Sequence, residues 1–175
     1  HTTDLLRADP VALCRTLAAS ITTPAPSDWL HAFLEQERRA VELSHVDGND
    51  APYEGAIIAT LGRLLPADTV LFSGNSMAIR DLDTYLAPRA QPLHIHANRG
   101  ASGIDGNIST LLGLAAAANP APVVGLVGDL AFYHDMNGLL AARGLDATII
   151  LLNNDGGGIF RYLPQATLPG FAQHW

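Results

Sequence analysis

The chain has 175 residues, of which 48% are hydrophobic and 15% charged, so one folded domain with a sizeable core is expected rather than disorder. All ten basic residues are arginines, which excludes a Walker phosphate loop and a Schiff-base lysine within this chain. The single cysteine excludes an internal disulfide, and the net charge of −7 disfavours general nucleic-acid binding.

The first third of the chain has helical patterns separated by turn-forming stretches. Asp9 followed by Pro10 predicts a helix start, because aspartate caps free N–H groups and proline fits the first turn. The stretches Thr22–Pro26 (TTPAP) and Val46–Pro52 (VDGNDAP) are typical of a linker and of a turn. The predicted helices span about residues 10–19, 27–46 and 53–65.

From residue 69 onward, short apolar runs alternate with helical patterns. The runs are apolar on both faces, which favours strands of a parallel sheet that is covered by helices on both sides. The expected fold is therefore a doubly wound α/β domain with a mostly parallel sheet. The predicted strands are Thr69–Ser73, Pro92–Ala97, Val123–Val127 and Ala147–Leu152. The predicted helices are residues 76–86, 107–118 and 130–142, with a short one near 159–163.

Polar and glycine-rich loops follow all four predicted strands. Ligands bind at the carboxyl ends of the strands in parallel sheets, so we expect the functional site at this edge. The four loops are Gly74–Ser76, Asn98–Gly106, Gly128–Leu130 and Asn153–Gly158.

Asp129 and Asn154 end successive units of this pattern. If their strands are neighbours, the Asp129 carboxylate, the Asn154 amide oxygen and a free carbonyl of Gly156 converge. Such oxygen ligands suit Mg²⁺, which typically takes one or two carboxylates together with substrate phosphates. The helix that begins after Asp129 also offers free N–H groups to an anion. The pattern favours a metal-bridged diphosphate, although each motif alone is also typical of a helix cap or a turn.

A two-part motif, GDL at residues 128–130 and NN at residues 153–154, resembles the cofactor- and metal-binding motif of thiamine-diphosphate-dependent decarboxylase-like enzymes. Within this family, longer stretches are similar to the synthases that join 2-oxoglutarate to isochorismate in menaquinone biosynthesis. The resemblance runs from about Asp50 to the end of the chain. The stretches are SGNSMAIRDLD (Ser73–Asp83), NRGASGIDG (Asn98–Gly106), GDLAFYHDMNGL (Gly128–Leu139) and NNDGGGIFRYLPQ (Asn153–Gln165).

The resemblance implies a role for each matching residue. Asp129, Asn154 and the Gly156 carbonyl would hold Mg²⁺ or Mn²⁺, which bridges the diphosphate of the cofactor, thiamine diphosphate. Ile104 would wedge the cofactor into its bent form, for which a β-branched side chain is stiff enough. The other cofactor contacts would come from Ser102, Gly103, Gly128, Leu130 and Gly157. The substrates would meet Asn75, Ser76, Arg80 and Arg99, with apolar Ile159, Phe160 and Leu163 at the mouth of the site.

The implied substrates, 2-oxoglutarate and isochorismate, each carry two carboxylates. A chain with a net charge of −7 needs local arginines to bind them, and the guanidinium matches a carboxylate with two parallel N–H groups. Arg80 lies four residues after Ser76 on a predicted helix, so both side chains can face one pocket. The alternative for Arg80 and Arg99 is a surface salt bridge.

The resemblance also implies parts that this chain does not show. In this family a second domain, generally from a partner subunit, binds the aminopyrimidine and supplies an activating glutamate. None of Glu35, Glu37, Glu42 or Glu54 ends a strand in a matching motif, so we expect no catalytic residue and no turnover in this chain. Residues 1–25 would end a preceding middle domain, and residues 26–175 would form the diphosphate-binding domain, truncated at its C-terminus.

The intact enzyme is then expected to be a cytoplasmic homodimer or homotetramer that binds no nucleic acid. No stretch reaches 18 apolar residues, so no membrane span is predicted. The N-terminus lacks a basic segment followed by an apolar run, so no signal peptide is predicted either.

Considered without the resemblance, the sequence leaves other functions open. A dinucleotide-binding oxidoreductase would use the glycines of residues 100–106, although their GxxGxxG spacing departs from GxGxxG. A hydrolase would use Gly74–Ala78 as an approximate nucleophile elbow, with Asp146 and His174 later in the chain. A non-catalytic interaction module is a third alternative, but it does not explain the loops whose oxygen atoms suit a metal ion. Within the resembled family, another 2-oxo acid decarboxylase or ligase is a further alternative.

Overall fold

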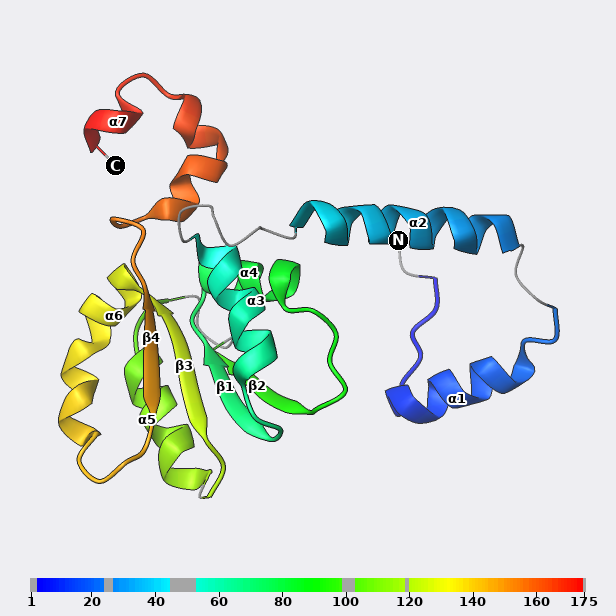
Figure 1. Cartoon of the computed structure of the whole chain (residues 1–175), viewed down its shortest axis with the longest axis horizontal. Helices are drawn as coiled ribbons and strands as arrows, with labels where there is room; N and C mark the ends of the chain where they lie inside the picture. The colour runs from blue at the N-terminus through cyan, green and yellow to red at the C-terminus, as the bar shows by residue number, and fades with distance from the viewer. Residues whose placement is uncertain (1–2, 24–26, 45–52, 99–102, 119, 175) are drawn as a thin grey trace. The chain divides into compact units, whose positions relative to one another are not determined.

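The computed structural model of the chain describes residues 3–23, 27–44, 53–98, 103–118 and 120–174 (Figure 1). The chain divides into two compact units, His1–Asn49 and Asp50–Trp175. The division predicted at residues 25 and 26 concerns a longer protein and stays a prediction. No helix in the described ranges is long and apolar enough to cross a membrane.

The first unit contains two helices, α1 (Pro10–Ser20) and α2 (Ser27–Ser44). The helix α1 begins as predicted, because Asp9 Oδ1 accepts a hydrogen bond from the Ala12 N–H at 2.8 Å and proline occupies the first turn. On α2, the rings of Trp29 and Phe33 stack with centroids 5.5 Å apart. The described side chains of both helices are largely exposed.

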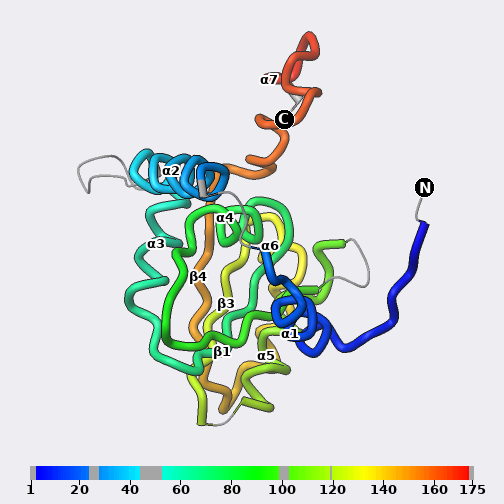
Figure 2. Tube along the Cα trace, turned by 90° about the vertical axis from the view of Figure 1, so that its right-hand side faces the viewer, coloured from blue at the N-terminus to red at the C-terminus, as the bar shows by residue number. Residues whose placement is uncertain are grey.

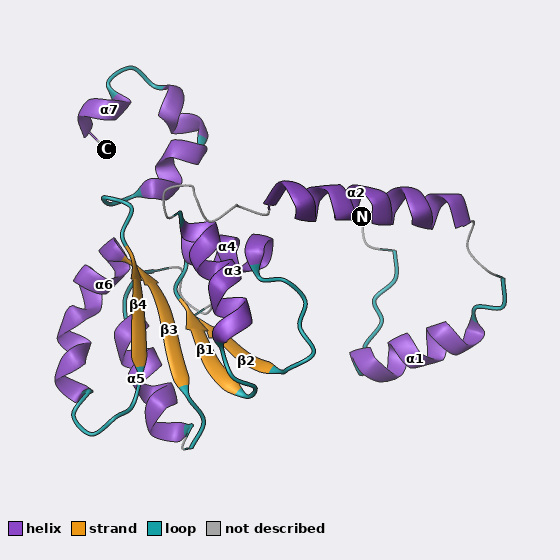
Figure 3. Ribbon diagram, in the orientation of Figure 1, coloured by secondary structure: helices purple, strands orange, loops and turns teal. Residues whose placement is uncertain are grey.

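The second unit is built on a four-stranded sheet in the order β2-β1-β3-β4, with every neighbouring pair parallel (Figure 3). The predicted doubly wound α/β fold is thereby confirmed. The strands are β1 (Thr69–Ser73), β2 (Leu93–Ala97), β3 (Val123–Gly128) and β4 (Thr148–Leu152). The α-helices are α3 (Glu54–Leu64), α4 (Met77–Tyr85), α5 (Asn107–Ala117), α6 (Asp129–Asp135) and α7 (Phe171–His174). The 3₁₀-helices are η1 (Met136–Ala141), η2 (Gly158–Tyr162) and η3 (Pro164–Thr167).

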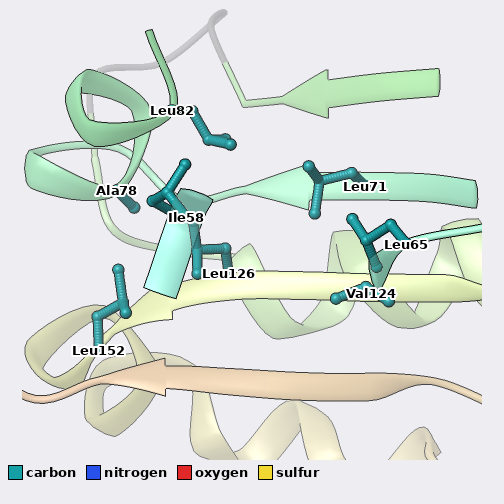
Figure 4. Close-up of a cluster of buried hydrophobic side chains, with 8 residues drawn as sticks. All are labelled: Ile58, Leu65, Leu71, Ala78, Leu82, Val124, Leu126 and Leu152. Atoms are coloured by element: carbon teal, nitrogen blue, oxygen red, sulfur yellow. The ribbon is translucent and has the colours of Figure 1, made fainter. Parts of the chain in front are cut away.

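Two apolar clusters cover opposite faces of the sheet. Successive side chains of a strand point to opposite faces, so Leu71 and Phe72 of β1 enter different clusters, and both are fully buried. Leu71 packs with Ile58 of α3 and Leu82 of α4 (Figure 4). Phe72 belongs to the cluster formed with α5 and α6, and Figure 2 shows the strands between α3 and α5. Burial on both faces explains why the sequences of the central strands β1 and β3 are largely apolar.

The strand order places a crevice between β1 and β3. The chain passes from β1 outward to β2 on one side, and from β3 outward to β4 on the other. The loops after β1 and β3 therefore diverge, and such a reversal is where open α/β sheets bind ligands. The two strands stay close there, since the Gly74 N–H donates to the Leu126 carbonyl at 2.8 Å.

The helix predicted over residues 130–142 is wrong in its second half. The α-helix α6 ends at Asp135, and the chain continues as the 3₁₀-helix η1. Asp135 has φ −115° and ψ 16°, outside helical geometry, and its carboxylate bonds the start of α5 instead. Gly138 then lies against α5 so closely that a Cβ would meet Ser109 Oγ at 3.0 Å. Contacts with α5 thus replace the regular continuation of the helix.

Candidate functional site

A cavity of about 250 Å³ lies at the carboxyl ends of β1, β3 and β4. It lies at the edge of the sheet that the sequence predicts, beside the crevice between β1 and β3. Its lining includes ten of the predicted site residues: Asn75, Ser76, Ile104, Gly128, Asp129, Leu130, Asn154, Gly157, Ile159 and Phe160. Four separate segments of the chain therefore meet at one place.

The loops that carry Asp129 and Gly156 are in direct contact. Asp129 Oδ2 accepts a hydrogen bond from the Gly156 N–H at 2.7 Å, and Oδ1 accepts one from the Leu130 N–H at 2.8 Å. Asn154 lies in the same loop as Gly156, and its Oδ1 accepts from the Gly158 N–H at 3.1 Å. Each oxygen keeps a free lone pair, because a carboxylate or amide oxygen accepts more than one bond.

Glycines allow the loop after β4 to turn back on itself. Asp155, Gly156 and Gly157 all have left-handed φ values, of 62°, 81° and 63°. Glycine adopts this conformation without steric cost, and aspartate tolerates it better than most residues. Gly158 is needed for a different reason, since a Cβ there would lie 2.6 Å from Cγ of Asn154. The glycine run therefore sets where the Asn154 amide lies.

Ser76, between β1 and α4, has a strained backbone. Its φ of 66° and ψ of −127° fall in a region that is essentially reserved for glycine. This is the strand-turn-helix position of a nucleophile elbow, but His174, the histidine of the hydrolase alternative, is not among the residues that line the cavity. The strain instead places the residues after β1 at the cavity.

Asn75 carries an unsatisfied acceptor at the cavity. Its Nδ2 donates to the Gly103 carbonyl at 3.2 Å, whereas its Oδ1 is buried and accepts no hydrogen bond in the described structure. A buried acceptor without a donor is costly, so this oxygen is available to a ligand that brings an N–H or O–H.

The segment that carries Ile104 is braced by α6. The Ile104 side chain lines the cavity, and its carbonyl accepts from Asn107 Nδ2 at 2.7 Å. On α6, His134 Nε2 bonds Asp105 Oδ1, and Asp135 Oδ2 accepts from the Ile108 N–H at 2.7 Å. His134 and Asp135 are thus positioned beside the site rather than in its lining.

Six predicted site residues lie elsewhere or outside the described ranges. Gly103 and Gly156 bond cavity-lining residues without lining the cavity themselves. Arg80 is exposed, donates to the Ser76 carbonyl at 2.7 Å and borders a neighbouring cavity of about 700 Å³. Leu163 is half-buried and is not part of the lining, whereas Arg99 and Ser102 lie outside the described residues.

The residue that the sequence reasoning missed is Glu54. It lies at the first position of α3, lines the cavity, and accepts a hydrogen bond from Asn154 Nδ2 at 3.0 Å. Behind it, Asp81 of α4 is 5% exposed, and burial, together with the nearby Glu54, raises its pKa to about 6. No local pattern marks Glu54, because its partner is 100 positions away in the chain.

Comparison with known proteins assigns the chain to a family of domains. Residues 80–173 match the family described as "Thiamine pyrophosphate enzyme, C-terminal TPP binding domain". This match covers more than half of the chain, and the chain belongs to that family of domains, which bind thiamine pyrophosphate, another name for thiamine diphosphate.

Individual relatives carry one name, 2-succinyl-5-enolpyruvyl-6-hydroxy-3-cyclohexene-1-carboxylate synthase. The chain is 52% identical to that of Chloroflexus aurantiacus over 161 residues, which are 90% of this chain and 27% of the relative. With that of Geobacillus thermodenitrificans the identity is 48% over 171 residues, 94% of this chain and 28% of the relative. The identity to the synthase of Geobacillus kaustophilus is 58% over 120 residues, which are 67% of this chain and 20% of the relative. The chain thus spans about a quarter of its relatives' length.

Proposed function

We propose that this chain is the diphosphate- and metal-binding part of a longer thiamine-diphosphate-dependent synthase. The intact enzyme would decarboxylate 2-oxoglutarate and join the remaining four-carbon unit to isochorismate, forming the product named in its relatives. The observation that carries the proposal is the contact between Asp129 and Gly156, which brings the two halves of the cofactor motif to one cavity.

The residues present fit a metal-bridged diphosphate. Asp129, Asn154 and the Gly156 carbonyl supply oxygen ligands only, which is the chemistry that Mg²⁺ or Mn²⁺ prefers. Gly128 lines the cavity, and a Cβ on it would meet nothing within 4 Å, so a phosphate can approach the backbone there. The orphaned Asn75 Oδ1 offers an acceptor to a donor group of the cofactor or substrate.

The protein's own contribution is binding and orientation. When bound, thiamine diphosphate supplies the electron sink that a decarboxylation requires. Asp129 and Asn154 would hold the metal ion that accompanies its diphosphate, and Ile104, which also lines the cavity, would support its bent conformation. Ile159 and Phe160 would cover the site with apolar surface and exclude water from it.

Arginine side chains would bind the substrate carboxylates. The guanidinium of Arg80 is anchored by Nη1 on the Ser76 carbonyl, at the edge of the cavity, and has further N–H groups for a carboxylate. We assign the same role to Arg99 by its place in the matching motif. Ligand-observed NMR with 2-oxoglutarate, cofactor and Mg²⁺ should detect binding to the parent chain and a weaker signal with Arg80→Ala.

The remaining parts of the proposal concern the intact enzyme. It would be a cytoplasmic homodimer or homotetramer in which a preceding domain, absent from this chain, contributes the activating glutamate. The isolated chain should therefore release no carbon dioxide from 2-oxoglutarate with cofactor and Mg²⁺ present, and detectable release would contradict this expectation.

Calorimetric titration with thiamine diphosphate, with and without Mg²⁺, tests the proposal directly. The parent chain should bind only when the metal is present, and Asp129→Ala should abolish binding because a metal ligand is lost. Asp146→Ala, which removes an exposed carboxylate, is the matched control and should bind like the parent. A chain that is folded by circular dichroism but binds nothing in either condition would contradict the proposed function.

A further inference from the structure

The side-chain amide of Asn154 is held at both ends. Its Nδ2 donates to Glu54 Oε1 at 3.0 Å, and its Oδ1 accepts from the Gly158 N–H at 3.1 Å. We propose that Glu54 is the positioning residue for Asn154, fixing the amide so that its oxygen, and not its nitrogen, is presented to the metal ion. This inference rests on the proposed function, in which Asn154 is a metal ligand.

The chemistry of the two partners determines the orientation of the amide. An asparagine amide has nearly the same shape after a 180° flip, but only one orientation offers an oxygen to a cation. An ionised carboxylate accepts hydrogen bonds and donates none, whereas a backbone N–H donates only. Glu54 therefore selects the nitrogen and Gly158 selects the oxygen. A flipped amide would set oxygen against carboxylate and nitrogen against N–H.

The packing of α3 determines the position of Glu54. The next residue, Gly55, is buried so closely that a Cβ would lie 2.4 Å from the Tyr53 ring and 2.8 Å from the Tyr85 ring. Those two rings meet edge to face, with centroids 5.8 Å apart, and Tyr85 belongs to α4. The start of α3 therefore packs closely against α4, and this packing fixes the position from which Glu54 contacts Asn154.

The carboxylate of Glu54 acts on the proposed metal ligand through its hydrogen bond to Asn154 Nδ2. Partners that orient a metal ligand are typically worth 10- to 100-fold in metal affinity. Loss of the Glu54 acceptor leaves the Asn154 amide held only by the Gly158 N–H on its oxygen, so the amide is less well fixed and metal-dependent cofactor binding should weaken by about that factor.

The first measurement needs no cofactor. In ¹⁵N-labelled ligand-free chain, the Asn154 Nδ2 protons, assigned by their loss in Asn154→Ser, should exchange slowly with solvent. They should exchange faster in Glu54→Ala and remain slow in Glu54→Gln, because the glutamine carbonyl still accepts from Nδ2. Asp83→Ala removes an exposed carboxylate of α4 and serves as the control for charge. If Glu54→Ala does not fold, Glu54→Met removes the acceptor at nearly constant volume.

The second measurement is the calorimetric affinity for thiamine diphosphate with Mg²⁺. We expect about a 10- to 100-fold loss in Glu54→Ala, with Glu54→Gln and Asp83→Ala close to the parent. Unchanged amide exchange in Glu54→Ala, or a Glu54→Gln variant that binds as poorly as Glu54→Ala, would overturn the positioning role. A parent chain that shows the protected amide but binds no cofactor would refute the proposed function, and with it the role in presenting a metal ligand.

Discussion

Asp135 caps the helix α5, which begins 28 residues earlier in the chain, at Asn107. Its Oδ2 accepts hydrogen bonds from the Ile108 N–H at 2.7 Å and from the Ser109 N–H at 3.0 Å, at the start of α5. The residue in the local N-cap position is Gly106, which has a left-handed φ of 69° and no side chain to accept from these groups. A carboxylate from α6 therefore satisfies the free N–H groups of α5 and complements its dipole.

Asp135→Ala should lower the free energy of unfolding by about 1–2 kcal/mol, the usual cost of losing a helix cap. Asp135→Asn should cost less, because the amide oxygen still accepts from both N–H groups while the charge is lost. Urea denaturation measures both variants. Equal stability of Asp135→Ala and the parent would mean that water replaces the cap without penalty.

Ser76→Gly should raise the free energy of unfolding by about 1 kcal/mol or more, because glycine adopts the φ of 66° without strain. Ser76→Ala keeps the strain and should not stabilise the chain, which makes it the matched control. Thermal and urea unfolding are the measurements. A glycine variant no more stable than the alanine variant would show that the backbone relaxes at no cost.

Gly158→Ala should weaken metal-dependent cofactor binding by about tenfold or more, because the new Cβ would lie 2.6 Å from Asn154 Cγ and displace the amide. Calorimetry measures the affinity. The control is Gly113→Ala, in an exposed part of α5 where a Cβ meets nothing within 4 Å. That variant should bind like the parent and gain about 0.5–1 kcal/mol of stability. Unaltered binding in Gly158→Ala would contradict the role of this close contact.

The stability of the chain should depend on pH through Asp81. Its pKa lies at about 6 in the folded state, raised by burial and by Glu54, whereas aspartate in an unfolded chain ionises near the ordinary value of 3.8. The unfolded state therefore loses its proton first, and this group reduces stability as pH rises from about 4 to about 6, by on the order of 2–3 kcal/mol.

Asp81→Asn should remove that loss. Its amide can donate to Glu54 at any pH, so the variant should be more stable than the parent at pH 7.5 and nearly equal to it at pH 4. Urea denaturation across this range gives the difference, and a difference that does not change with pH would contradict the assignment to Asp81.

The parts of the fold and of the candidate site that the sequence predicts are those that depend on local sequence patterns. Apolar runs identify the strands, because burial on both faces demands continuous apolar residues, as in Thr69–Ser73 and Val123–Gly128. The rule that parallel strands end at one edge of the sheet predicts that the loops carrying Asp129 and Asn154 lie close together. The hydrogen bond from the Gly156 N–H to Asp129 shows that these loops are in contact.

The sequence did not predict the features that depend on contacts between residues far apart in the chain. The break between α6 and η1 is not marked in residues 130–142, since it depends on Asp135 and Gly138 meeting α5. Glu54 was passed over because it follows no strand, although it bonds a residue 100 positions away.

The sequence by itself thus determined the α/β fold and the edge of the sheet at which Asp129 and Asn154 lie, because hydrophobic periodicity and loop composition are local properties. Only the tertiary structure decided the strand order that opens a crevice between β1 and β3, the cap that Asp135 provides and the orientation of the Asn154 amide. These features depend on which helix packs on which face of the sheet. A hydrogen bond between residues far apart in the chain produces no periodic pattern in the sequence.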